Sequence, residues 1–114
     1  MKFREKEIDK VKVFEIYDNI FQDTGIPEFQ ESIMATLNNG SKEFIIDLGG
    51  VEHINSIGLA VLIRAYTSTK KAGADILFTS LTLKVKEMLF ITRIDTLFTI
   101  YDTTEEAVAK LKKT

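Results

Sequence analysis

The stretch from Phe44 to Arg64, FIIDLGGVEHINSIGLAVLIR, constrains the fold more than any other part of the chain. It opens with a short apolar run rich in β-branched residues, which is typical of a central strand covered on both faces. Gly49 and Gly50 end this strand, and a polar loop follows. A second apolar run of helical character begins directly after Asn55-Ser56. The sequence therefore predicts a buried strand, a loop and a helix.

The start of this helix carries two candidate capping residues. Asn and Ser are both preferred as N-caps, because their side-chain oxygens accept backbone N–H bonds that the first turn cannot satisfy internally. We expect one of Asn55 and Ser56 to be the cap and the other to be its neighbour. Either way the Ser56 hydroxyl lies at the carboxyl end of a strand, where open α/β sheets usually keep their ligand and partner sites. A phosphate there would suit the helix dipole and would add about two negative charges to a docking surface.

The rest of the chain alternates between strands and helices. In chain order we expect strands at 3–8 and 11–16, a polar loop at 18–25, and a helix from Pro27 to a left-handed cap at Asn39-Gly40. The strand at 44–48 and the helix from Ser56 to Ala72 follow, and then a strand at 76–78, a helix at 82–92 and a strand at 98–101. Thr103 and Glu106 open a last helix as a capping box. This order predicts an α/β fold. We expect a mixed sheet of four to five strands with about four helices packed mainly on it, in a single domain of residues 1–114.

Composition argues against several classes of function. The chain has 114 residues, a net charge of −2 and scattered basic residues, so it lacks the basic stripe of a nucleic-acid-binding protein. It has no cysteine and a single histidine, and we therefore expect no disulfide, no metal and no cofactor. The first ten residues lack the apolar core of a signal peptide, and no apolar run is long enough to span a bilayer. These features predict a cytoplasmic protein.

A catalytic site would need a nucleophile, a base and an orienting group within reach of one another. The only obvious base near Ser56 is His53, and no nucleophile-elbow motif surrounds the serine. We therefore expect His53 to be a solvated loop residue, and we expect no catalytic residue. The two glycines before the loop could cradle a phosphate, but the sequence contains neither the Walker pattern nor the dinucleotide fingerprint. Binding of a nucleotide or another small ligand stays open at this point.

The run DLGGVEHINSIGLAVL, residues 47–62, resembles the signature of STAS domains, the fold shared by sulfate transporters and anti-sigma factor antagonists. In that signature a strand ends in an Asp-Ser pair, and Gly-Leu and a helix follow. The C-terminal part is similar as well, because a Phe precedes the last strand and a Glu-Glu-Ala helix closes the chain. The residues that carry this second similarity are Val85, Leu89, Ile94, Leu97-Phe98 and the closing YDTTEEAVAKL. The resemblance covers nearly the whole chain from Phe44 onward.

The resemblance implies a stand-alone anti-sigma factor antagonist, which is a non-enzymatic regulatory module. In that family the serine matching Ser56 is phosphorylated by a partner that is both a serine kinase and an anti-sigma factor. The unphosphorylated antagonist binds that partner and frees the sigma factor, and a phosphatase resets the cycle. Ser56 is thus the expected phosphorylation site. The residues expected to form the partner-binding surface are Asn55, Ser56, Ile57, Gly58, Leu59 and Arg64.

The resemblance also implies a second hypothesis. Some members of the family are unphosphorylated scaffold or transporter-associated subunits, so the chain could be a phosphorylation-independent adaptor in a signalling or lipid-transport complex. Asn55 is the residue that bears on this choice. It stands where antagonists usually carry Asp, and it keeps the capping geometry while dropping a charge.

Overall fold

The computed structural model describes residues 1–20 and 24–112, so the part of the predicted polar loop at 21–23 lies outside the described residues. The described residues form one five-stranded sheet in the order β1-β2-β3-β4-β5, together with four α-helices and a short 3-10 helix, η1. The elements are β1 (Phe3–Ile8), β2 (Val11–Ile16), α1 (Ile26–Asn38), β3 (Glu43–Asp47), α2 (Ser56–Lys71), β4 (Asp75–Thr79), α3 (Leu83–Ile91), η1 (Ile94–Thr96), β5 (Ile100–Tyr101) and α4 (Thr104–Lys112). β1 is antiparallel to β2, and the other neighbouring pairs are parallel. The predicted mixed α/β fold is confirmed.

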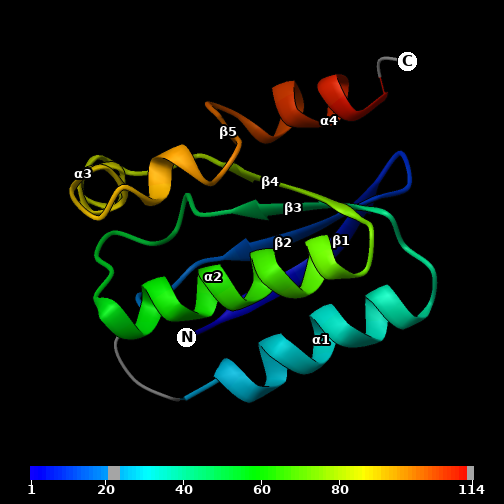
Figure 1. Ribbon diagram of the computed structural model, residues 1–114, viewed down its shortest axis with the longest axis horizontal. Helices are drawn as coiled ribbons and strands as arrows, with labels where there is room; N and C mark the ends of the chain where they lie inside the picture. Colours follow the sequence, from blue (N-terminus) through cyan, green and yellow to red (C-terminus); the bar gives the residue numbers. More distant parts are fainter. Residues whose placement is uncertain (21–23, 113–114) are drawn as a thin grey trace.

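Helices cover both faces of the sheet, as Figure 1 shows. α1 and α2 lie side by side on one face, and α4 lies on the other. Successive side chains of a strand point to opposite faces, so neighbours on β3 enter different cores. Ile46 packs in the cluster that includes the α1 and α2 side chains, whereas Ile45 packs against α4. Both side chains are fully buried, which confirms that β3 is a central strand covered on both faces.

The opening hairpin follows the sequence closely. Its turn consists of Asp9 and Lys10, which have φ angles of 50° and 70°. Two consecutive residues with positive φ give the kind of two-residue turn whose twist matches that of an antiparallel pair. The register pairs Ile8 with Val11 next to this turn.

The last strand differs from the prediction. Residues 98–101 were expected to be a strand, but β5 contains only Ile100 and Tyr101. The backbone before it forms η1, and the Phe98 N–H donates to the Ile94 carbonyl at 3.1 Å. Phe98 is apolar because it packs in the core, where its ring stacks on Phe78 with centroids 4.0 Å apart. A buried aromatic residue outside regular structure therefore gave the same signal as a strand residue.

Candidate functional site

The loop between β3 and α2 is fixed by hydrogen bonds to two other segments. The Asn19 side-chain oxygen accepts from the backbone N–H groups of both Glu52 and His53, at 2.9 Å each. The Thr82 hydroxyl, just before α3, donates to the Val51 carbonyl at 2.8 Å. The loop that leads to Ser56 is thus held from the β2 side and from the α3 side.

Two glycines allow this loop to approach its neighbours closely. A methyl group on Gly50 would collide with the backbone of Tyr17, and one on Gly58 would collide with the Ile54 side chain. Ile54 in turn forms a parallel β-bridge with Ile20. Gly58 is therefore a buried packing residue and adds no exposed group to the expected partner-binding surface.

Asn55 is the N-cap of α2. Its Oδ1 atom accepts from the Ile57 and Gly58 N–H groups at 3.0 and 3.2 Å, and its carbonyl accepts from the Leu59 N–H at 2.9 Å. The choice between two candidate caps is settled in favour of Asn55. Ser56 is the first residue of the helix, and its side chain is exposed. Folding of α2 therefore does not depend on the serine hydroxyl.

The environment of Ser56 favours negative charge. The N-terminal end of a helix carries a partial positive charge from its aligned peptide dipoles. The first turn of α2 holds no acidic residue that would repel a phosphate. The N–H groups of Ile57 and Gly58 already bond to Asn55, so a phosphate on Ser56 would interact mainly with the dipole and with solvent.

The six residues expected to form the partner-binding surface differ in exposure: Asn55 is half-buried at the N-cap, Gly58 is buried, and the other four divide into two groups. Ser56, Ile57 and Arg64 are exposed on α2, and Ile57 keeps 38% of its surface accessible. Leu59 was expected on this surface, but only 8% of it is exposed and it belongs to the core. In the structure Leu59 lies on the side of α2 that packs in the core, together with Leu62 three positions further on. The exposed face includes Ala60 instead, one turn after Ser56, which the helical period could have identified.

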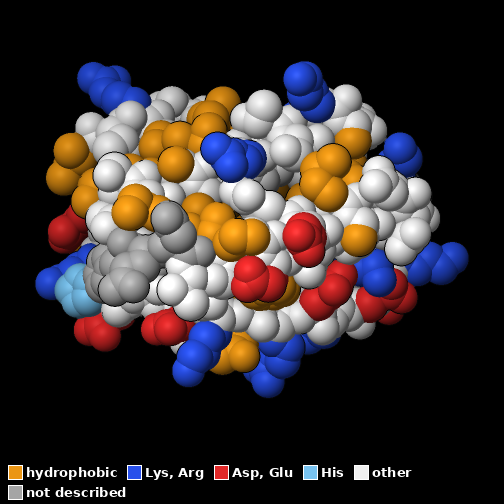
Figure 2. All heavy atoms as spheres, turned by 90° about the horizontal axis from the view of Figure 1, so that it is seen from below, with side chains coloured by type: hydrophobic (Ala, Val, Ile, Leu, Met, Phe, Trp, Pro, Cys, Tyr) orange, Lys and Arg blue, Asp and Glu red, His pale blue; other side chains and the backbone are white. Residues whose placement is uncertain are grey.

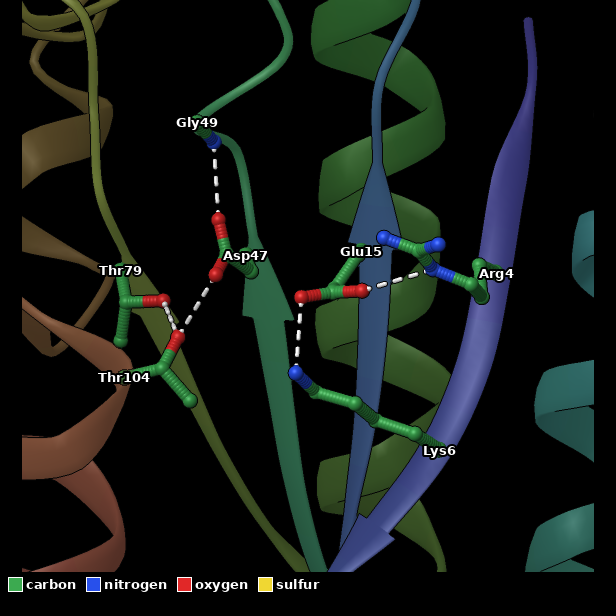
Figure 3. A network of polar contacts seen from close by, with 7 residues as sticks. All are labelled: Arg4, Lys6, Glu15, Asp47, Gly49, Thr79 and Thr104. Carbon is green, nitrogen blue, oxygen red and sulfur yellow. Dashed lines mark hydrogen bonds and ion pairs between the residues drawn. The ribbon is translucent and has the colours of Figure 1, made fainter.

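Asp47, at the end of β3, links the loop to the opposite layer of the fold (Figure 3). Its Oδ1 atom accepts from the Gly49 N–H at 2.9 Å, and its Oδ2 atom accepts from the Thr104 hydroxyl at 2.8 Å. The hydroxyls of Thr104 and Thr79 are also 2.8 Å apart. Because Thr104 donates to Asp47, Thr79 donates to Thr104. The start of α4 is thereby tied to the strand that leads to Ser56.

The surroundings of His53 and the distribution of acidic side chains bear on catalysis and metal binding. His53 lies on the loop with 41% of its side chain exposed, and its Nε2 atom is 4.0 Å from a Glu52 carboxylate oxygen. Among residues 1–20 and 24–112, no three His, Asp or Glu side chains gather in a group able to hold a metal ion. The helices of this part of the chain are all too short or too polar to cross a bilayer.

Comparison with known proteins places these features in a family context. A family model described as the STAS domain matches residues 3–107. A protein of Thermotoga maritima, named as a candidate anti-sigma factor antagonist, is 31% identical over 77 residues, which are 68% of each chain. A crystal structure of the same description from that organism is 27% identical, covers 97% of this chain and 95% of its own, and has a TM-score of 0.85. The anti-sigma factor antagonist SpoIIAA, a Bacillus cell fate determinant, shares the fold at 10% identity. Its unphosphorylated and phosphorylated forms have TM-scores of 0.78 and 0.76 and cover 99% and 97% of this chain with their full length.

Proposed function

Because the chain belongs to the STAS domain family, we propose that it is an anti-sigma factor antagonist whose partner binding is switched off by phosphorylation of Ser56. Its partner is a serine kinase that also acts as an anti-sigma factor, and a phosphatase restores the binding form. The protein itself has no catalytic role in this cycle, which takes place in the cytoplasm. The observation that carries the proposal is that Asn55, not Ser56, caps α2.

The capping arrangement leaves Ser56 available for modification. An N-cap residue contributes about 1 kcal/mol to helix stability, and this contribution comes from Asn55. A kinase can therefore modify the exposed hydroxyl while the hydrogen bonds that begin the helix stay in place. The two SpoIIAA structures support this reasoning, since one protein of this fold has been observed in an unphosphorylated and in a phosphorylated form.

No basic residue of α2 is close enough to Ser56 to neutralise the charge of a phosphate there. The first basic residue of α2 is Arg64, eight positions further along the helix. At about 1.5 Å of rise per residue, the two positions are about 12 Å apart along the helix axis. This exceeds the Debye length of about 8 Å at physiological ionic strength. The charge would thus face the partner next to Ile57, and desolvating it would oppose binding.

Phosphorylation by the cognate kinase tests the site. The purified chain is incubated with the kinase and ATP, and the phosphorylated residue is located by mass spectrometry. We expect one phosphate in the wild type, none in Ser56→Ala, and one in the control Thr67→Ala, which removes another exposed hydroxyl of the same helix. A phosphate that persists in Ser56→Ala would contradict the assignment.

One observation favours a phosphorylation-independent adaptor as a second candidate. The Asn55 side chain already occupies two N–H groups at the start of α2, which are donors that a phosphate could otherwise use. The Ser56→Asp variant separates the two functions. A switch protein should bind its partner at least tenfold more weakly after this change, whereas an adaptor should keep its affinity. Isothermal titration of the partner with both forms measures the difference.

A further inference from the structure

A groove runs between α1 and α2, on the face of the molecule that Figure 2 shows. It contains two neighbouring cavities, of about 170 and about 210 Å³. Residues from both helices line the first cavity, namely Phe29, Gln30, Ile33, Met34, Arg64, Ala65 and Ser68. The second cavity is lined by Ile26, Gln30, Ile57, Ala60, Val61 and Arg64. Gln30 and Arg64 border both cavities, so the two lie next to each other along the groove.

The lining of this groove is apolar with a single charge. Arg64 is the only charged residue among the described residues that line either cavity. Its guanidinium forms no ion pair and no hydrogen bond within residues 1–20 and 24–112, whereas Arg4 and Lys112 are both paired with glutamates. In Figure 2 the acidic side chains of this face gather mainly in its lower half, and hydrophobic side chains reach the surface in patches above them. The groove thus combines apolar walls with an available cation.

We propose that the groove between α1 and α2 binds a medium-chain aliphatic carboxylate. The carboxylate pairs with the Arg64 guanidinium, which presents a planar set of donors suited to two parallel hydrogen bonds. The Gln30 amide, on the facing helix, supplies a second polar contact. The alkyl chain lies in the cavity beside Met34 and Ala65. This site goes beyond the proposed switch at Ser56 and does not depend on it.

The volumes of the two cavities set the length of the ligand's alkyl chain. An apolar cavity of about 150 Å³ inside a protein holds a benzene molecule, so the 170 Å³ cavity accommodates roughly six carbon atoms. The second cavity, which Arg64 also lines, adds room for further carbons, so the ligand has about eight to ten carbons. The two cavities together, at about 170 and 210 Å³, fall in the lower range of small-molecule sites. Octanoate is therefore the probe of choice.

Titration of the isotope-labelled chain with octanoate, followed by NMR, tests the site without any partner protein. We expect saturable binding with a dissociation constant on the order of 0.1 mM, given the affinity that a ligand of this size can reach. The amide signals of Ala65 and Ser68 should shift most. Arg64→Gln should weaken octanoate binding by about tenfold or more, because a charge-assisted pair is lost. Lys71→Gln, which removes an exposed cation of the same helix, should change it less than twofold.

Two further ligands, one uncharged and one positively charged, and one variant that blocks the cavity complete the test. Octanol should bind more weakly than octanoate and should be insensitive to Arg64→Gln, and octylammonium should not saturate the site. Ser68→Leu places a larger side chain in the 170 Å³ cavity and should abolish octanoate binding while thermal unfolding confirms an intact fold. Equal binding of octanol and octanoate, with no effect of Arg64→Gln, would overturn the proposal. Failure of octanoate to saturate the protein below its micelle concentration would overturn it as well.

Discussion

The two faces of the sheet are covered to different depths. On one face α1, α2 and α3 bury a large core that contains four fully buried aromatic rings, Phe14, Phe29, Phe44 and Phe78. On the other face a single nine-residue helix, α4, packs over β3, β4 and β5. Its contribution to that core consists of the small side chains of Ala107 and Val108, with Leu111 partly buried beside them. Burial of apolar surface therefore stabilises the first layer far more than the second.

Polar contacts compensate on the thinly covered face. Asp47 and Thr79 hold the start of α4 through Thr104, and the Lys112 ammonium holds its end through a 2.8 Å contact with Glu43. Hydrogen bonds and ion pairs are directional, so they can fix the position of a helix whose apolar contact area is small. The α4 layer thus combines a small apolar contact with polar contacts at both ends of the helix, whereas apolar packing fixes α1 and α2.

This difference bears on the candidate site. The rigid layer supplies α2, whose first residue is Ser56. The layer that contains α4 is connected to the same loop through Asp47, whose Oδ1 atom accepts from the Gly49 N–H. The loop before Ser56 is therefore connected to both layers.

Two neighbouring residues of β3 provide the most direct test of the comparison. Ile45 and Ile46 are both fully buried but face opposite layers. Truncation of a buried isoleucine to alanine costs about 2–5 kcal/mol, and the cost rises when the surroundings cannot collapse into the cavity. We expect Ile46→Ala to lower the free energy of unfolding by about 1 kcal/mol more than Ile45→Ala, because the aromatic core is more constrained than the α4 layer.

Urea unfolding, monitored by circular dichroism, measures both variants, and the slope of the transition serves as the control. An unchanged slope means that the surface exposed on unfolding is the same, so the midpoints can be compared directly. Equal losses, or a larger loss for Ile45→Ala, would show that the α4 layer is packed as rigidly as the other.

Thr104→Val tests whether polar contacts hold the thin layer. The change keeps the shape of the side chain but leaves the fully buried Thr79 hydroxyl and one Asp47 oxygen without this partner. Leaving a buried polar group unsatisfied costs about 1–3 kcal/mol. We expect a loss of stability in this range by urea unfolding. The double variant Thr79→Val/Thr104→Val should recover part of it, since both buried hydroxyls are then removed.

The exposed neighbour provides the control for this variant. Thr103 accepts a hydrogen bond from the Glu106 N–H at 3.1 Å, which is one of the two bonds of the predicted capping box, and its hydroxyl donates to the Glu106 carboxylate at 3.3 Å. Thr103→Val removes this cap, which costs about 1 kcal/mol, and no double variant with Thr79 should restore it. Recovery in both cases would mean that the Thr79 hydroxyl is destabilising by itself.

The sequence was sufficient to predict most of the fold. Strand and helix periodicity, glycine stops and caps are local signals, so the elements from β1 to α4 could be located and ordered from them. The limits came from residues whose environment is set by distant parts of the chain. Phe98 is buried by a stacked ring of β4, and the sequence around it cannot distinguish this packing from a strand.

The candidate site shows the same division. Asn55-Ser56 was recognised as a capping pair because the signal lies in two adjacent residues. Which of the two caps the helix depends on backbone geometry, and the burial of Leu59 depends on the direction in which α2 meets the sheet. The groove that Arg64 borders could not be predicted at all, because it requires α1 and α2 to lie side by side.

The smallest expected effect concerns the part of the thin face that carries ion pairs on β1 and β2. There the Lys6 ammonium, and then the Arg4 guanidinium, hold the pKa of Glu15 below its ordinary value of 4.5 (Figure 3). A lowered pKa in the folded state means that the ion pairs stabilise the fold above the ordinary pKa, and that this stabilisation is lost as the pH falls through the folded-state pKa. Glu15→Gln should therefore lower the free energy of unfolding at pH 7 by about 0.2–1 kcal/mol.

The pH dependence of this effect is what distinguishes an ion pair from packing. In strongly acidic solution the Glu15 carboxyl is protonated in the wild type as well, so the wild type and Glu15→Gln should unfold at the same urea concentration. Glu7, whose pKa is lowered by its contact with Lys12, provides the matched variant on the α1 side of the hairpin. Glu7→Gln should change stability less than Glu15→Gln, because Glu7 has one cationic partner and is more exposed. If Glu15→Gln and the wild type still differed in stability in acid, Glu15 would stabilise this face by packing. The contrast between a polar and an apolar layer would then not extend to β1 and β2.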